Sequence, residues 1–151
     1  MNTEPINSGD KITEMSSHVD KSFQRASWRI SKDLPTSFYY AFKGVAYGFF
    51  SQRNFRVQLV LGTIVICLGM VLQLDPIKMA MIILTISLVL ILELINTAIE
   101  ATVDLAIGRR FHPLARIAKD CSAGAVLIAS FGSTLLALIL LLPPLFNLLG
   151  L

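Results

Sequence analysis

Residues 93–104, which read ELINTAIEATVD, carry side chains whose types and spacing suit proton transfer and metal binding. The polar members of this segment, here called the polar stripe, are Glu93, Asn96, Glu100 and Asp104. They are spaced three, four and four residues apart, so an α-helix would project all of them from one narrow face. Apolar residues 79–92 precede them, and ionisable groups at membrane depth are costly unless they face protein, water or a ligand. The polar stripe is therefore the first place to look for a function.

The depth of the stripe suits transfer of a phosphoryl group to a membrane alcohol. At a helical rise of about 1.5 Å per residue, Glu93 lies about 21 Å from Met79, and Glu100 about 31 Å, against a hydrocarbon thickness of about 30 Å. Glu93 would then lie just inside the membrane edge, where it could accept a proton from a lipid hydroxyl. Glu100, nearer to water, could hold Mg²⁺, which favours a few hard oxygen ligands plus substrate phosphates.

A basic segment, residues 108–120, follows the stripe and could supply positive charge for a polyphosphate. Its cations are Arg109, Arg110, Arg116 and Lys119. Taken alone, these cations fit interfacial ion pairs and topology determinants better, and His112 could be a solvated loop residue. The sequence contains no Gly-rich loop of the Walker or soluble-kinase type. A soluble nucleotide-binding fold is therefore unsupported.

The composition indicates an all-α integral membrane protein. Hydrophobic residues make up 54% of the 151 residues and charged residues 15%, a balance far from that of an ordinary soluble domain. Three membrane spans are predicted, at about residues 57–74, 77–100 and 121–142. The second helix is expected to persist to Ile107 before Gly108 stops it, and the third to end at the prolines 143–144. Cys67 and Cys121 have no spacing that suggests a disulfide framework or zinc.

The segment before the first span divides into two parts. Residues 1–35 are polar with charges of both signs, which predicts a mobile cytoplasmic tail. Residues 36–53 place apolar side chains on one helical face and tyrosines beside them, which predicts an amphipathic helix lying in the membrane surface. The membrane domain would thus span residues 36–151.

The distribution of Lys and Arg predicts the orientation. Eight precede the first span, one (Lys78) lies between the first and second, and four lie between the second and third. The positive-inside rule then places the N-terminus and the 108–120 loop in the cytoplasm, as in a multi-pass protein of a bacterial-type plasma (inner) membrane. The net charge of +3 is modest, and nucleic acid is not expected as a partner.

Two blocks of the chain resemble a known family. ELINTAIEATVD looks like the signature of the small prokaryotic membrane kinases, comprising diacylglycerol kinase and undecaprenol kinase, and HPLARIAKDCSAGAVLIA looks like their second characteristic block. The second block favours the undecaprenol-kinase-like branch over the enterobacterial one. The resemblance covers about residues 37–142. It implies a three-span bundle with a surface helix, assembled as a homotrimer whose sites use more than one protomer.

The resemblance also implies roles for individual residues. Glu93 matches the catalytic carboxylate, Glu100 a magnesium and nucleotide ligand, and Asn96 and Asp104 the polar positions beside them. The other positions implied in nucleotide binding are Arg110, Phe111, His112, Lys119 and Asp120. One position departs from the pattern, because Gln52 stands where the family usually has a metal-binding Glu. An amide oxygen brings no negative charge, so metal affinity is expected to fall.

The function expected from these observations is transfer of the γ-phosphoryl group of ATP, with Mg²⁺, to diacylglycerol, giving phosphatidic acid. Undecaprenol is the alternative acceptor, because a surface helix and apolar walls accept either tail. A non-catalytic membrane packing protein that keeps the fold is a further alternative, and Gln52 is the feature that supports it.

Overall fold

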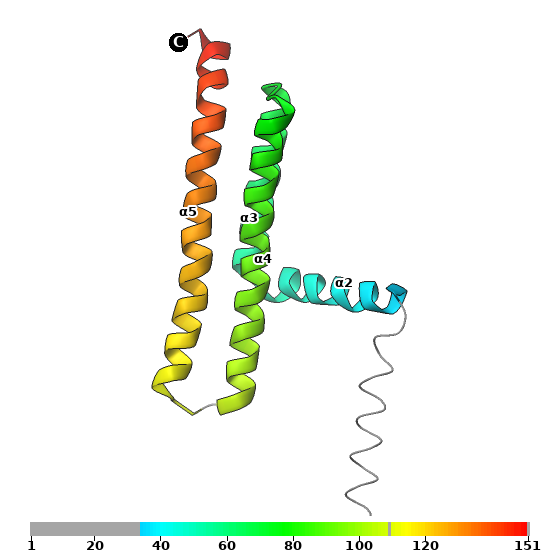
Figure 1. Cartoon of the computed structure of the whole chain (residues 1–151), viewed down its shortest axis with the longest axis vertical. Helices are drawn as coiled ribbons and strands as arrows, with labels where there is room; N and C mark the ends of the chain where they lie inside the picture. Colours follow the sequence, from blue (N-terminus) through cyan, green and yellow to red (C-terminus); the bar gives the residue numbers. More distant parts are fainter. Residues whose placement is uncertain (1–33, 109, 151) are drawn as a thin grey trace, which may run out of the picture. The chain divides into compact units, whose positions relative to one another are not determined.

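A computed structural model of the chain describes residues 34–108 and 110–150. These residues form four helices in the order α2 (Leu34–Ser51), α3 (Arg53–Val71), α4 (Pro76–Ile107) and α5 (Pro113–Leu149) (Figure 1). The last three are long and apolar enough to cross a membrane, which confirms the predicted all-α membrane fold with three spans. The chain divides into two compact units, residues 1–43 and 44–151, and the candidate site lies within the second.

The predicted tail, residues 1–35, lies outside the described residues except for its last two. Leu34 and Pro35 already belong to α2, so the helix predicted at 36–53 begins two residues earlier and ends at Ser51. Proline is well tolerated in the first turn of a helix, where its missing N–H has no partner to lose.

The ends of α4 follow from local chemistry. The side chain of Asp75 caps its N-terminus by accepting a hydrogen bond from the backbone N–H of Lys78 at 3.0 Å. The ammonium of Lys78 lies 2.9 Å from the same carboxylate, and together these bonds hold the pKa of Asp75 below its ordinary value. Gly108 follows the last turn with φ of 61°, a conformation that favours glycine. The predicted stop at Gly108 is confirmed.

The helices that contain the first and third predicted spans have bounds that differ from those of the spans. Helix α3 starts four residues before Val57, because Arg53 and Arg56 can keep their charged ends in water while their backbone is helical. Helix α5 starts at Pro113 and continues through Pro143 and Pro144 to Leu149. The φ that proline imposes is compatible with a helix, and the lost hydrogen bonds are tolerated in spanning helices. Hydropathy marks the lipid-embedded part of a helix, not its ends.

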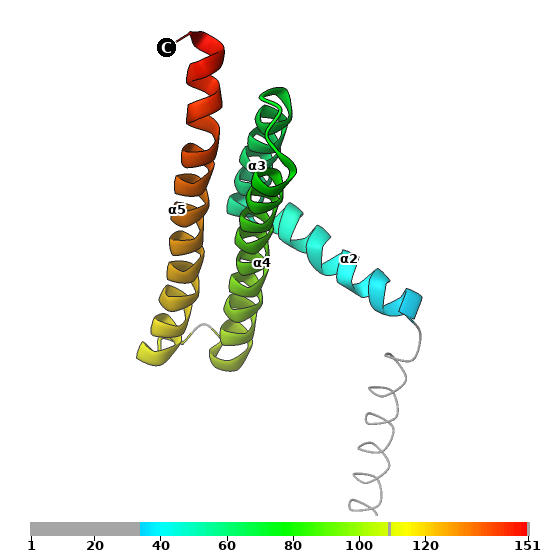
Figure 2. The same ribbon diagram turned by 45° about the horizontal axis from the view of Figure 1, so that its top comes forward.

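Helix α4 is the centre of the packing. It packs along both α3 and α5, whereas α3 and α5 meet at few points (Figures 1 and 2). Ile82 and Val89 of α4 are almost fully buried, at 1% and 3% exposed. Gly62 of α3 allows a close approach, since a Cβ placed there would lie 2.7 Å from Cγ2 of Ile86. The polar stripe therefore sits on the helix that both neighbours contact.

Candidate active site

Glu93 is the most enclosed charged group in the described part of the chain. Only 4% of it is exposed, although it carries a carboxylate, and Thr97 one turn later is 8% exposed. The Thr97 hydroxyl donates a hydrogen bond to the backbone carbonyl of Glu93 at 2.9 Å, so this hydroxyl is satisfied within α4. Glu93 is thus enclosed by other parts of the chain.

Glu93 faces a cavity of about 270 Å³ between α3, α4 and α5. Its polar lining residues are Asn54 and Gln58 of α3, Glu93 and Asn96 of α4, and Ser130 of α5. Apolar side chains such as Val57, Val126 and Leu127 complete the wall. A carboxylate in a small cavity with amide and hydroxyl neighbours can receive a proton from an alcohol bound there.

A hydrogen-bonded chain fixes the middle of the polar stripe. The amide nitrogen of Asn96 donates to Oε1 of Glu100 at 3.2 Å, which agrees with their predicted position on one face. The hydroxyl of Ser122 on α5 lies 2.6 Å from the amide oxygen of Asn96 and 2.9 Å from the carbonyl of Lys119. Its single proton can serve only one of these acceptors at a time. The Asn96 amide therefore contacts Glu100 through its nitrogen and lies within hydrogen-bond distance of Ser122 through its oxygen, and Glu100 is oriented by the first of these contacts.

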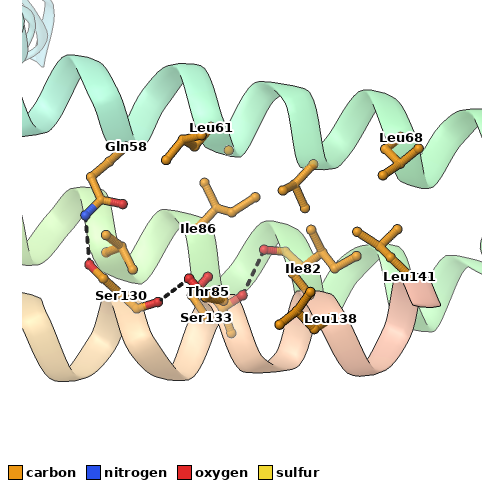
Figure 3. Close-up of a pocket in the computed structure, with 15 residues that line it drawn as sticks. Gln58, Leu61, Leu68, Ile82, Thr85, Ile86, Ser130, Ser133, Leu138 and Leu141 are labelled. Carbon is orange, nitrogen blue, oxygen red and sulfur yellow. Dashed lines mark hydrogen bonds between the residues drawn. The ribbon is translucent and has the colours of Figure 1, made fainter.

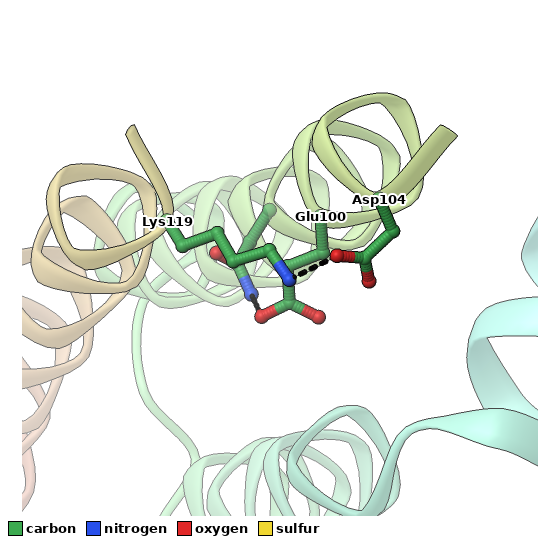
Figure 4. Close-up of polar contacts among 4 residues, drawn as sticks. Glu100, Asp104 and Lys119 are labelled. Carbon is green, nitrogen blue, oxygen red and sulfur yellow. Dashed lines mark hydrogen bonds and ion pairs between the residues drawn. The ribbon is translucent and has the colours of Figure 1, made fainter. Parts of the chain in front are cut away.

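Lys119 crosses from α5 to α4 at the solvent end of the stripe. Its ammonium lies 2.5 Å from Oδ1 of Asp104, as Figure 4 shows together with Glu100. The Lys119 side chain is 35% exposed and that of Asp104 60%, so water and ions reach the pair. An exposed ion pair contributes little stability, about 0–1 kcal/mol, and Lys119 can exchange this partner for a phosphate at small cost.

The connection between α4 and α5 carries Arg110, Phe111 and His112. With Ala106 and Ile107 they line an open cavity of about 550 Å³. His112 is the N-cap of α5, and its Nδ1 accepts a hydrogen bond from the backbone N–H of Leu114 at 3.2 Å. His112 is therefore a capping residue as well as a loop residue. Phe111 is 77% exposed, so its ring is free to contact a bound group.

Lys119 and Asp120 do not share a partner. Asp120 lies 3.6 Å from the guanidinium of Arg116 one turn earlier on α5, and both side chains are more than two-thirds exposed. Lys119 instead faces α4 through Asp104. Within the described residues, the structure brings together Asn96, Glu100, Asp104 and Lys119 but gives Asp120 a separate contact.

The two residues expected to bind magnesium are Glu100, which has a carboxylate, and Gln52, which has an amide. Gln52 is half-buried at the N-cap of α3, and its side chain makes no capping hydrogen bond. Residues 34–108 and 110–150 contain no group of three or more His, Cys, Asp or Glu that could form a metal site by themselves. Glu100, whose carboxylate is oriented by Asn96, fits a Mg²⁺ ion that arrives with nucleotide phosphates, because this ion commonly uses one or two protein carboxylates.

Four polar residues of the site were not predicted from the sequence, namely Asn54, Gln58, Ser122 and Ser130. Ser122 lies three residues after Lys119 and four before buried Val126, a spacing that marks the face of α5 toward α4. Gln58 is an uncharged polar residue inside an apolar span, and its amide donates to Ser130 at 2.8 Å. A polar side chain at membrane depth is by itself a reason to suspect a site, and this criterion would have found Gln58.

The comparison with known families matches residues 39–141 to the model of prokaryotic diacylglycerol kinase. The chain belongs to the prokaryotic diacylglycerol kinase family. This confirms the resemblance inferred from the two sequence blocks. The matched range includes the polar stripe, the α4–α5 connection, the first turns of α5 and Ser122, so the whole candidate site lies within the family domain.

Individual members of the family are similar over most of the chain. A diacylglycerol kinase of Synechocystis sp. is 47% identical over 128 residues, which cover 85% of this chain and 73% of that protein. An undecaprenol kinase of Bacillus subtilis is 39% identical over 109 residues, covering 72% and 88%. A diacylglycerol kinase of Escherichia coli is 37% identical over 90 residues, covering 60% and 73%. Family membership identifies the chain as a membrane lipid kinase that uses ATP and phosphorylates an alcohol.

Proposed function

We propose that this chain transfers the γ-phosphoryl group of ATP to the hydroxyl of diacylglycerol, giving phosphatidic acid. The observation that carries the proposal is the enclosed Glu93 carboxylate, which faces a cavity lined by α3, α4 and α5. Glu93 lies two helical turns before Glu100, toward the end of the stripe where Lys119 contacts Asp104. The relative with 47% identity bears the name diacylglycerol kinase, which favours this acceptor.

Glu93 is the proposed general base. The acceptor hydroxyl would lie in the cavity of about 270 Å³ and give its proton to the Glu93 carboxylate. The hydroxyl oxygen then forms a bond to the γ-phosphorus while the bond from that phosphorus to the β-phosphate oxygen breaks, and ADP leaves. The enclosed position of Glu93 keeps competing water away from the phosphoryl group.

The solvent end of the stripe is the proposed nucleotide site. Lys119 would leave Asp104 for a phosphate oxygen, and Arg110, Phe111 and His112 would lie along the rest of the nucleotide with Asp120. Glu100, oriented by Asn96, would hold Mg²⁺, which would neutralise charge on the phosphates. Gln52 would contribute at most a neutral oxygen there.

The assembly and orientation are part of the same proposal. The charge distribution supports a plasma (inner) membrane protein with its N-terminus and the loop at 108–112 in the cytoplasm, where ATP is present. Many large apolar side chains of α3, α4 and α5 are exposed in the single chain, and lipid or further copies must cover them. The homotrimer implied by the family resemblance would cover part of this surface.

Undecaprenol is the competing acceptor, because the relative from Bacillus subtilis carries that name and is covered over 88% of its length. The test is phosphorylation in mixed micelles with labelled ATP, with each lipid offered alone at equal surface concentration. The proposal expects a higher kcat/KM for diacylglycerol. A higher kcat/KM for undecaprenol would reverse the choice of acceptor, and labelling of neither lipid would contradict the lipid kinase activity itself.

A further inference from the structure

The hydrogen bond between Gln58 and Ser130 stands where two cavities meet. Gln58 and Ser130 line the polar cavity that contains Glu93, and both also line an apolar groove of about 320 Å³ that runs deeper along the spans. The groove walls come from α3, α4 and α5, and its apolar members include Leu61, Ile86 and Leu138 (Figure 3). The pair therefore lies at the boundary between the polar cavity and the apolar groove.

The groove follows α4 away from Glu93. Val89 and Ile82 line it four and eleven residues before Glu93, which is about 6 and 16 Å at the helical rise. An amphiphile whose hydroxyl lies at Glu93 would thus place its next atoms beside Gln58 and Ser130 and its hydrocarbon along the groove. Beyond Gln58 and Ser130 the groove is lined mostly by apolar side chains, together with Thr85, Ser133 and Thr134. The Thr85 and Thr134 hydroxyls donate to carbonyls of their own helices at 3.0 and 2.8 Å, so the mainly apolar part of the groove suits the hydrocarbon of an acylglycerol.

The Gln58 and Ser130 side chains keep hydrogen-bonding capacity that this contact does not use. The amide nitrogen of Gln58 has two N–H donors, and one of them serves Ser130 Oγ at 2.8 Å. Among the described residues, Ser130 Oγ acts only as an acceptor, so its own proton is available. A donor without a partner is costly in a membrane interior. The junction is therefore suited to a ligand that brings a hydrogen-bond acceptor.

We propose that Gln58 and Ser130 bind an ester carbonyl of the lipid acceptor and so select an acylglycerol over a polyprenol, with one acyl chain in the groove. This inference rests on the proposed function and adds specificity-determining residues to it. Diacylglycerol carries ester carbonyls a few bonds from its hydroxyl, whereas a polyprenol has no polar group besides the hydroxyl. An acceptor without carbonyls leaves the free donors of the pair unsatisfied, which is the strongest basis for rejecting it.

The test measures each enzyme variant on two substrates that differ only in the ester carbonyls. The substrates are diacylglycerol and dialkylglycerol, its ether-linked analogue, measured in mixed micelles with saturating ATP. The wild type is expected to use the ester about two- to tenfold better in kcat/KM, the range of one hydrogen bond. In Gln58→Leu and Ser130→Ala that preference is expected to disappear, because the ester loses a hydrogen bond and the ether no longer leaves a donor unsatisfied.

Thr63→Val is the control variant. Thr63 is also a polar residue of α3, but its hydroxyl donates to its own helix at the carbonyl of Leu59, 2.8 Å away, and it lines neither cavity. The control is expected to keep the wild-type preference for the ester. A control that loses the preference would show that any polar deletion in α3 has this effect, and would overturn the assignment.

The remaining outcomes distinguish failure of this inference from failure of the proposed function. Equal loss on both substrates, or a changed oligomeric state of Gln58→Leu, would show that the pair or the groove packs against another helix and would overturn the inference. An unchanged ester preference in both variants would also overturn it, since the carbonyl would then be bound elsewhere. A wild type that phosphorylates neither acylglycerol would contradict the proposed function, a result distinct from all of these.

Discussion

At the scale of the residue, three carboxylates of α4 differ in their surroundings, and these surroundings suit each of them to a different task. Glu93 is enclosed beside amides and hydroxyls, Glu100 accepts a hydrogen bond from Asn96, and Asp104 faces the ammonium of Lys119. The enclosed Glu93 suits proton transfer, and the oriented Glu100 suits binding of a metal ion. Asp104 holds the Lys119 ammonium, which can instead bind a phosphate.

Ser122 tests whether the orientation of Asn96 matters. Ser122→Ala removes the hydroxyl 2.6 Å from the Asn96 amide oxygen, so we expect kcat to fall about fivefold and the free energy of unfolding to fall by about 1 kcal/mol. Ser122→Thr keeps the hydroxyl and is expected to restore most of kcat. The measurement is lipid phosphorylation at saturating ATP and lipid. Equal kcat values for the alanine and threonine variants would contradict a role for the hydroxyl.

Gln52 tests the metal site. Gln52→Glu adds a carboxylate at the N-cap of α3, and we expect the variant to need less free Mg²⁺ for half-maximal activity while the maximal rate changes little. Gln73→Glu, in the turn at the other end of α3, makes the same change away from the site and is the matched control. A magnesium titration at saturating ATP decides the matter. If the requirement of Gln52→Glu is unchanged, Gln52 lies outside the metal's surroundings.

Spacing along the sequence predicted the contact between Asn96 and Glu100, because both lie on one helix whose geometry is fixed. It could not predict that Ser122 binds Asn96 or that Gln58 binds Ser130, since those contacts depend on how α3 and α5 are aligned along α4. The partner of Lys119 was missed for the same reason. No pattern in the sequence pointed to Asp104, which contacts Lys119 only because α5 packs against α4.

At the scale of the element, close packing of α3 on α4 shapes the apolar groove. Gly62 lines the groove, and a Cβ at this position would meet Ile86 at 2.7 Å. The end of α4 at Gly108 could be predicted from the sequence, because it depends on the backbone conformation of that residue alone. The passage of α5 through Pro143 and Pro144 could not, because it depends on how a spanning helix accommodates lost hydrogen bonds.

Gly62→Ala is expected to destabilise the protein by about 1–3 kcal/mol, because Ile86 or the whole of α3 must move to admit the methyl group. Gly44→Ala in α2 is the matched control, since nothing lies within 4 Å of a Cβ there. It is expected to stabilise its helix by up to about 1 kcal/mol. The free energy of unfolding in mixed micelles checks both. A Gly62 variant as stable as the control would contradict the close approach of α3 and α4.

At the scale of the whole molecule, function depends on which side of the membrane the α4–α5 loop faces. After Cys67→Ala and Cys121→Ala remove the two free, exposed thiols, single cysteines can be placed at exposed positions. Ile77→Cys, at the start of α4, is expected to react in intact cells with an impermeant thiol reagent. Leu114→Cys, at the start of α5, is expected to be protected until the cells are opened. The reverse labelling would place the proposed nucleotide site away from ATP.

The central claim is that Glu93 accepts the proton of the lipid hydroxyl, and Glu93→Gln tests it most directly. The amide keeps the shape and a hydrogen-bonding group but cannot act as the base, so the rate of diacylglycerol phosphorylation should fall about a hundredfold to ten-thousandfold. The fold and oligomeric state, followed by circular dichroism and cross-linking, should be those of the wild type. A correctly folded variant that keeps more than about a tenth of the wild-type rate would contradict the account, because general-base catalysis by Glu93 cannot survive this substitution.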